Sequence, residues 1–203
     1  MSYFVLIGGG TCSGKTTLTA NIVEKLPYDF TWIKMDDYYH DLTHFSPKQM
    51  KLYNFDTPES IDFDALEEDV TDLLNGKTIQ KRSYNFVKHA VTISNEVITP
   101  REIIIVEGIF AFCEKTLFKK ADLKIYADLD SDLRLARRLI RDVAERGFDF
   151  KGTINQYLKN VRPMHEKYIE RSKEYADIIM HTENNFDKLL KEIDTLLKKM
   201  KAE

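Results

Sequence analysis

One eight-residue run constrains the fold of this chain more than any other feature. Residues 9–16 read Gly-Gly-Thr-Cys-Ser-Gly-Lys-Thr, which matches the pattern G-x-x-x-x-G-K-[ST]. The apolar run Tyr3–Ile7 precedes it, and a helical pattern over Lys15–Leu26 follows it. In that context the loop N–H groups point at phosphate oxygens, and the helix N-terminus adds a favourable dipole. The motif predicts a phosphate-binding loop (P-loop) in which Lys15 reaches the β- and γ-phosphates and the Thr16 hydroxyl ligates Mg²⁺.

The rest of the chain alternates strand and helix patterns. The further predicted strands are Phe30–Met35, Glu102–Val106, Leu123–Ala127 and Ile178–Met180. The further predicted helices are Asp62–Asn75, Ser131–Arg146, Thr153–Arg171 and Asn185–Lys201. This alternation predicts an α/β fold of the P-loop NTPase type, with a parallel sheet flanked by helices. The runs Lys81–Tyr84 and Val91–Ile93 predict a small β-hairpin inserted beside the sheet.

Residues at the helix ends support these assignments. Asp62 is suited to cap the N-terminus of its helix, and Gly76 to end it. Gly147 follows the arginine-containing helix in the same way. Pro163 lies inside a helical pattern, where we expect it to bend or break the helix.

Composition limits the class of protein. The 203 residues contain no Pro/Gly/Ser-rich linker, so we expect a single domain over residues 1–203. A net charge of −3 gives no global positive field for nucleic acid, and no apolar stretch is long enough for a membrane span. Two cysteines, Cys12 and Cys113, are too few for a disulfide framework. Without a signal-peptide pattern at the start, they indicate a reducing cytoplasm.

A P-loop leaves several classes of nucleotide-binding protein open. The chain has neither the Asn-Lys-x-Asp guanine reader of switch GTPases nor the Leu-Ser-Gly-Gly-Gln signature of transporter ATPases. A kinase needs a base near the acceptor hydroxyl and cations around the transferring phosphoryl group. Asp36 and Asp37 follow one predicted strand and Glu107 ends another, at the edge where α/β sheets bind ligands. From position alone, a polar turn and the charged end of a strand explain these acids equally well.

An arginine-rich helix supplies candidate cations. Its arginines lie at i, i+3, i+4 and i+7 on one predicted face, with a further one beyond: Arg134, Arg137, Arg138, Arg141 and Arg146. Guanidinium groups bind oxyanions bidentately, and five arginines with no lysine favour phosphate recognition. A solvated charged face with Asp142 and Glu145 as ion-pair partners remains the alternative.

Eight segments in order resemble the uridine kinase (uridine–cytidine kinase) family, from about residue 3 to residue 180. The first is the P-loop ending Gly14-Lys15-Thr16-Thr17. The others are residues 36–39 (Asp-Asp-Tyr-Tyr), 53–58 (Tyr-Asn-Phe-Asp-Thr-Pro), 84–89 (Tyr-Asn-Phe-Val-Lys-His), 106–109 (Val-Glu-Gly-Ile), 137–147, 156–164 and 175–179. The resemblance implies a kinase that uses ATP and Mg²⁺ to phosphorylate the 5′-hydroxyl of uridine or cytidine in pyrimidine salvage. It also implies a homotetramer.

The resemblance further implies a role for each matching residue. Asp36 would be the base for the 5′-hydroxyl, and Thr16, Asp36 and Glu107 would surround Mg²⁺. Lys15, Arg141 and Arg146 would act on the transferring phosphates. The residues that would bind ATP are Gly9, Gly10, Thr11, Cys12, Ser13, Gly14, Lys15, Thr16 and Thr17. Those that would bind the nucleoside are Asp56 and Arg138 at the ribose hydroxyls, Tyr84, His89 and Gln156 as polar contacts, and Phe55, Phe86 and Tyr157 around the base.

The chain departs from the family pattern at three places. Phe148 stands where the family usually has arginine, the hairpin after His89 lacks a usual arginine, and residues 178–182 read Ile-Ile-Met-His-Thr instead of Ile-Ile-Pro-Arg-Gly. We expect Phe148 either to line the base pocket or to turn into the core. Two alternatives stay open: a kinase of this fold for another small alcohol, such as nicotinamide riboside or pantothenate, and a non-catalytic nucleotide-binding regulator. The presence of Lys15, Asp36 and Glu107 argues against the regulator.

Overall fold

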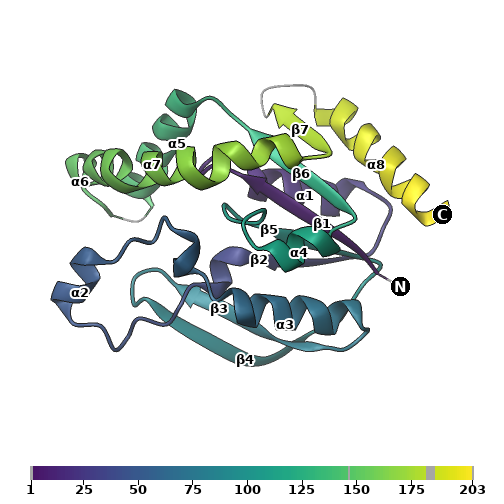
Figure 1. Ribbon diagram of the computed structural model, residues 1–203, viewed down its shortest axis with the longest axis horizontal. Coiled ribbons are helices and arrows are strands. Elements are labelled where there is room, and N and C mark those ends of the chain that lie inside the picture. The colour runs from purple at the N-terminus through teal and green to yellow at the C-terminus, as the bar shows by residue number, and fades with distance from the viewer. Residues whose placement is uncertain (1, 146, 182–185, 203) are drawn as a thin grey trace.

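A five-stranded parallel sheet forms the centre of the protein (Figure 1). The computed structural model describes residues 2–145, 147–181 and 186–202. The strand order is β2-β5-β1-β6-β7, with all neighbours parallel. The strands are β1 (Tyr3–Gly9), β2 (Phe30–Lys34), β5 (Ile103–Glu107), β6 (Leu123–Asp128) and β7 (Ile178–His181). All five predicted strands are confirmed, with ends that differ by at most two residues.

Helices separate these strands in the chain, as the alternation predicts, and α8 follows the last strand. They include α1 (Lys15–Lys25), α2 (Pro47–Leu52), α3 (Phe63–Leu74), α4 (Lys115–Lys120), α5 (Ser131–Ala144) and α8 (Phe186–Ala202). Asp62 caps α3, its side chain accepting from the Ala65 N–H at 3.1 Å, and Gly76 takes a left-handed φ of 79° just beyond the helix. Both caps are therefore confirmed. In the described part of the chain, no helix combines the length and apolarity that a membrane span requires.

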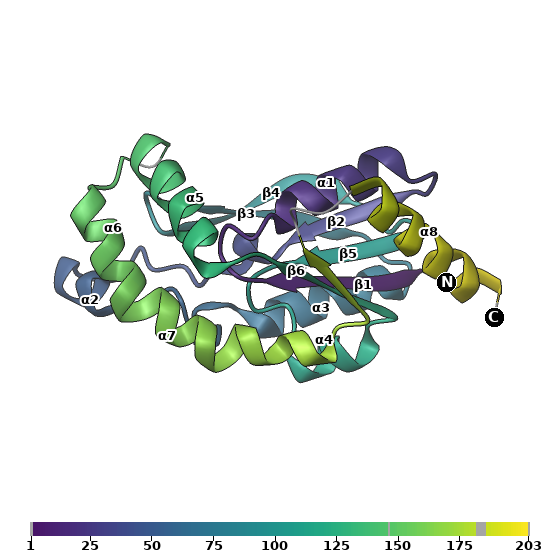
Figure 2. The same ribbon diagram turned by 90° about the horizontal axis from the view of Figure 1, so that it is seen from above.

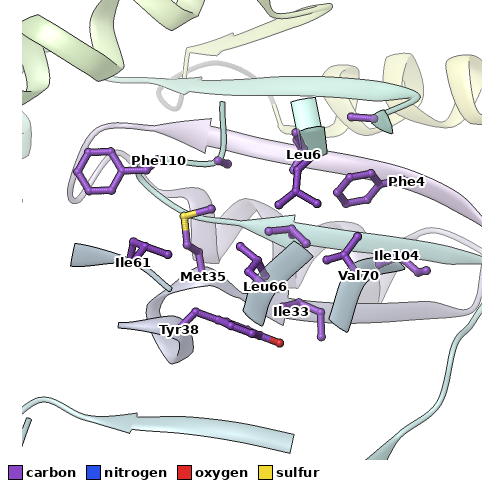
Figure 3. Close-up of a cluster of buried hydrophobic side chains, with 14 of the residues drawn as sticks. Phe4, Leu6, Ile33, Met35, Tyr38, Ile61, Leu66, Val70, Ile104 and Phe110 are labelled. Atoms are coloured by element: carbon purple, nitrogen blue, oxygen red, sulfur yellow. The ribbon is translucent and has the colours of Figure 1, made fainter. Parts of the chain in front are cut away.

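The two faces of the sheet are buried in two separate cores. Side chains alternate along a strand, so Phe4 and Leu6 of β1 point into the core that α3 covers (Figure 3). Val5 and Ile7 point into the opposite core, which α1 and α8 cover. Burying each such side chain stabilises the fold by roughly 1.5–3 kcal/mol. Burial on both faces explains why the strands are nearly continuous apolar runs.

The helical region before β7 differs from its prediction. It consists of α6 (Phe150–Gln156), a π-helical segment (Tyr157–Val161), α7 (Arg162–Met164), a second π-helical segment (His165–Ile169) and a 3₁₀ segment (Glu170–Tyr175). Figure 2 shows it running from the far end of α5 back to β7. Of the two outcomes expected at Pro163, a bend or a break, the break does not occur, because the chain stays helical on both sides. A proline ring clashes with the carbonyl four residues earlier in a regular α-helix, and that residue here belongs to the first π-helical segment, where the turn is wider.

The predicted hairpin is present, and it is longer than predicted. Strands β3 (Ile79–Asn85) and β4 (Ala90–Ile98) pair antiparallel as a sheet of their own. Two carboxylates of the segment after β2 bind its backbone. Asp37 accepts from the Tyr84 N–H at 3.2 Å, and Asp41 accepts from the Val91 N–H at 2.9 Å. The hairpin is thus held against the segment that follows β2.

Candidate active site

The P-loop has the backbone of an anion-binding site. Gly9 and Gly14 take φ values of 140° and 97°, and Cys12 takes 57°, so the chain curls between β1 and α1. Gly14 caps α1 without any side-chain hydrogen bond, which leaves N–H groups at the helix N-terminus for a ligand. Lys15 is buried, and its Nζ donates to the Gly10 carbonyl at 2.8 Å. Burial lowers the pKa of Lys15, while the charges of Glu107 and Asp36 oppose that shift.

Neighbouring strands bring two acids to this loop. β5 lies between β1 and β2, and its last residue, Glu107, pairs in register with Ile7 and Lys34. The Thr16 hydroxyl donates to Glu107 Oε1 at 2.8 Å. Burial raises the pKa of Glu107, and the charge of Lys15 opposes the rise. Asp36, two residues after Lys34, reaches the same edge.

The structure gives the two adjacent aspartates different surroundings. Both lie in a 3₁₀ turn, Met35–Tyr38, directly after β2. Asp36 is exposed and lines the cavities described below, whereas Asp37 binds the Tyr84 N–H of the hairpin. Burial raises the pKa of Asp37. Of the two carboxylates, Asp36 is the one that faces space for a ligand.

Two cavities meet at Asp36. The first, of ≈ 360 Å³, lies over the P-loop, and Lys15, Thr16, Glu107 and Arg137 are among its walls. The second, of ≈ 640 Å³, lies between the hairpin, α5 and α6. Both volumes fall within or near the range of small-molecule sites. The residues common to both cavities are Thr11, Asp36, Ile109, Arg141 and Glu145.

One wall of the larger cavity is a buried charged network. Arg138 Nη1 lies 3.9 Å from Asp56 Oδ1, and Arg138 Nε lies 3.1 Å from Asp142 Oδ2. The Arg138 guanidinium also donates to Gln156 Oε1 at 3.4 Å. Asp56 Oδ2 is buried with no hydrogen-bond partner among the residues that the structure describes. Burial raises the pKa of Asp56 and Arg138 opposes the rise, so a ligand that donates to this oxygen would stabilise the carboxylate.

Aromatic side chains form the opposite wall. Phe55 and His89 stack with ring centroids 4.9 Å apart, and Phe86 meets the ring of Tyr39 edge-on at 5.8 Å. Tyr84 lies behind them and is not among the lining residues, but its hydroxyl lies 3.3 Å from His89 Nδ1. Burial lowers the pKa of His89, which favours the neutral imidazole. A flat ring with a polar edge fits such a wall.

The arginines of α5 do not share one environment, although their spacing puts them on one face of the helix. Arg138 is buried at the larger cavity, Arg137 is exposed at the P-loop cavity, and Arg141 lies at both. Arg134 is buried beneath Gly10. Arg146, predicted to contact the phosphates, lies outside the described residues.

Most of the remaining predicted residues line the cavities. Among the described ones, those that line neither cavity are Gly9, Gly10, Ser13, Tyr84 and Tyr157. Tyr157 is buried in the first π-helical segment and lines neither of the two cavities. Phe148 lines the larger cavity and is 48% exposed, so it does not turn into the core. Sequence reasoning missed Tyr39 and Thr153 as lining residues. Tyr39 had a signal, since it lies two residues after the acidic pair, while Thr153 had none.

Fold and site together define the class. A P-loop between β1 and α1, acids at the ends of β2 and β5, and arginines over a second cavity are the parts of a P-loop kinase. A sequence profile of the Phosphoribulokinase / Uridine kinase family matches residues 4–188. The chain belongs to this family.

Individual relatives agree with that assignment. The chain is 45% identical over 177 residues to a uridine kinase of Staphylococcus haemolyticus, covering 86% of this chain and 84% of that one. It is 43% identical over 175 residues to a uridine kinase of Staphylococcus aureus, with the same coverage of each chain. Phosphoribulokinase from Rhodobacter spheroides has the same fold, with a TM-score of 0.64 at 16% identity over 91% of this chain and 74% of that chain.

Proposed function

We propose that this protein transfers the γ-phosphoryl group of ATP to the 5′-hydroxyl of uridine or cytidine. The observation that carries the proposal is the meeting of two cavities at Asp36 and Arg141, because phosphoryl transfer needs a donor and an acceptor that share one reacting centre. The uridine kinases named above, at 43% and 45% identity, support the choice of acceptor.

Mg²⁺ fits the donor side. Mg²⁺ sites in nucleotide-binding enzymes combine one or two carboxylates with the phosphates of the nucleotide. Thr16 and Glu107, whose side chains are hydrogen-bonded to each other, together with Asp36, offer the hydroxyl and carboxylate oxygens that this ion prefers. Held by these residues, Mg²⁺ would supply positive charge that offsets the negative charge developing during transfer.

The protein groups divide the remaining work between the two cavities. Asp36 accepts the proton of the 5′-hydroxyl as the hydroxyl oxygen attacks the γ-phosphorus. Lys15 and Arg141 stabilise the negative charge on the transferring group and on the leaving ADP. The loop N–H groups and the N-terminus of α1 hold the β-phosphate.

Acceptor binding follows from the two walls of the larger cavity. Asp56 accepts from the ribose 2′- and 3′-hydroxyls, which supplies the partner that its buried Oδ2 lacks among the described residues. Arg138 orients Asp56 and is itself held by Asp142. The base packs against Phe55 and Phe86, and His89 binds its polar edge, supported by Tyr84. Gln156 adds a hydrogen bond from α6.

A nucleoside panel with ATP and Mg²⁺ tests the proposal. We expect 5′-monophosphate formation from uridine and cytidine, and a loss of up to about 10⁴-fold in kcat/KM with 2′-deoxyuridine, because a buried site built for a hydroxyl is left unpaired. Nicotinamide riboside and pantothenate serve as the competing acceptors. Turnover of either one in preference to both pyrimidine ribonucleosides would overturn the assignment. Equal activity on uridine and 2′-deoxyuridine would overturn the role of Asp56.

A further inference from the structure

A buried arginine–histidine pair lies beneath the P-loop, outside both cavities. Arg134 of α5 is 4% exposed and His165 of the second π-helical segment is 7% exposed. Arg134 Nε donates to the Leu129 carbonyl at 2.9 Å, and its Nη2 lies 3.0 Å from His165 Nε2. The same Nε2 lies 2.9 Å from Glu170 Oε2. The reaction described above uses none of these side chains.

The contacts of His165 Nε2 exclude each other. A guanidinium only donates and an ionised carboxylate only accepts. When Nε2 is unprotonated it accepts from Arg134 and has nothing to give Glu170. When Nε2 carries a proton it donates to Glu170, and its N–H opposes the Arg134 N–H. The pair therefore has two hydrogen-bonding states, with and without a proton on Nε2. The state with the proton is either the neutral Nε2–H tautomer or the imidazolium, and only the imidazolium has gained a proton from solvent.

The pair also touches the loop itself. A Cβ built on Gly10 would lie 2.6 Å from Arg134 Nη1 and 3.0 Å from His165 Cε1. The P-loop pattern does not require glycine at position 10. The close approach of Arg134 and His165 explains why the residue at this position has no side chain. Arg134 Nη1 is buried without a hydrogen-bond partner in the described residues. The carbonyl of Gly10 meanwhile accepts from Lys15, the side chain proposed to turn toward the phosphates.

We propose that Arg134 and His165 are positioning residues of the P-loop, and that His165 takes up a proton when a nucleoside triphosphate binds above them. Lys15 leaves the Gly10 carbonyl for the phosphates, and the proton taken from solvent converts Nε2 into a donor to Glu170. Arg134 then loses its acceptor on His165 and is free to donate toward Gly10. The inference rests on the proposed nucleotide site but not on the identity of the acceptor.

The surrounding charges fix the direction of the effect. Burial lowers the pKa of His165, the charges of Arg134 on α5 and Lys15 on α1 lower it further, and Glu170 opposes them. Tyr126 of β6 faces the same cluster and stays neutral, because burial raises its pKa. The negative triphosphate offsets the positive charges of Lys15 and Arg134, so it raises the pKa of His165. Since the bound state then holds the proton more tightly, ATP affinity gains as pH falls through the histidine range.

The test compares the wild type with His165→Gln. A glutamine amide can accept from Arg134 and donate to Glu170 at once, so it keeps both contacts while removing the titration. We would measure the Kd of ATP without nucleoside by calorimetry between pH 5.5 and pH 8, in buffers of different ionisation enthalpy. The ratio of the two Kd values cancels the protonation of ATP itself. We expect the affinity of the wild type, relative to the variant, to rise about 5- to 10-fold toward low pH.

Further measurements separate positioning from general structural damage. Arg134→Lys should weaken ATP binding about tenfold while changing the KM of uridine less than twofold, since the pair lies under the donor loop. His44→Gln, at an exposed histidine outside both cavities, is the matched control and should behave as wild type.

NMR titration of the histidine imidazoles in the wild type should show the pKa of His165 rising when a non-hydrolysable ATP analogue binds. An unchanged His165 pKa, or identical pH dependence in the wild type and His165→Gln, would overturn the inference while leaving the proposed reaction intact. Failure of the wild type to bind ATP would overturn both.

Discussion

The donor and acceptor sides of the site are built in different ways. The P-loop of the donor side is one contiguous run, Gly9–Thr17, whose backbone N–H groups are arranged by the turn between β1 and α1. The acceptor side has no such run: most of its lining comes from the turn after β2, residues 55–56, the hairpin, α5 and residues 148–156. The P-loop therefore depends mainly on local geometry, whereas the acceptor side exists only when the tertiary structure has formed.

The charges around the two cavities also differ. Three cations (Lys15, Arg137, Arg141) and three acids (Asp36, Glu107, Glu145) line the donor cavity. The acceptor cavity pairs one buried arginine, Arg138, with carboxylates and adds an aromatic wall. A variant on one side should therefore change the kinetic parameters of that substrate and leave those of the other nearly constant. Substitutions from the largest to the smallest expected effect test this division.

Asp36, at the junction of the two cavities, should give the largest effect. Asp36→Asn removes the proposed base, so kcat should fall roughly 10²–10⁴-fold. The Kd of uridine should change far less, because the amide has nearly the same shape. Steady-state kinetics and equilibrium binding check both statements. If Asp36→Asn remains active while Asp37→Asn is inactive, the base has been assigned to the wrong carboxylate.

Lys15→Ala should affect the donor side alone. It removes a buried cation from the developing charge, and we expect a loss of about 10²-fold in kcat together with a raised KM for ATP. The KM of uridine should stay within about threefold of the wild type if the donor and acceptor sides bind their substrates independently. Near-normal turnover by the folded variant would contradict the role of the lysine.

Phe148→Arg should act on the acceptor side in the opposite direction. Phe148 lines the acceptor cavity and offers no hydrogen bond, whereas an arginine adds a donor toward the base or a nearby carboxylate. The position is half exposed, so we expect a gain of only about 1 kcal/mol, or roughly fivefold in kcat/KM for uridine. Phe148→Leu is the matched control and should give no gain. Parallel kinetics on uridine and cytidine would show whether preference between the bases also sharpens.

Asp37 should give the smallest effect. Its carboxylate joins the 3₁₀ turn to the hairpin by accepting from the Tyr84 N–H, a bond that an amide oxygen can also accept. Asp37→Asn should therefore keep kcat within about threefold, while Asp37→Ala should raise the KM of uridine several-fold with little change for ATP. Equal KM values in the two variants would show that this bond does not position the hairpin.

The sequence predicted the sheet and the position of the P-loop well, because both depend on local signals. Strands β1 and β5 are buried on both faces and read as apolar runs, so they could be found from hydrophobicity alone. The P-loop pattern identified Lys15 and Thr16 without any knowledge of the remaining fold. The strand ends predicted one sheet edge for Asp36 and Glu107, and both line the cavity over the P-loop.

The sequence predicted the surroundings of the arginines poorly. Helical spacing placed Arg134 and Arg138 on one face, yet Arg134 lies under the loop because His165 and the Leu129 carbonyl hold it there. Neither His165 nor Leu129 belongs to the periodic helical pattern that contains Arg134. The sequence also carried no sign of the π-helical turns on either side of Pro163, since such turns depend on tertiary packing and have no reliable sequence signal. The role of Tyr157 remains a prediction.

The hairpin belongs to a sheet of its own, and this has a consequence for which of its residues can be exchanged. The described strands β3 and β4 pair with each other and not with the sheet that carries the P-loop. The hairpin is held by backbone N–H groups bound to Asp37 and Asp41, by the ion pair of Arg82 with Asp69 at 3.2 Å, and by Tyr84 in the core. Phe86 and His89, which line the acceptor cavity, take part in none of these three attachments. We therefore expect substitutions at these two positions to change the fit of the acceptor while the hairpin stays in place.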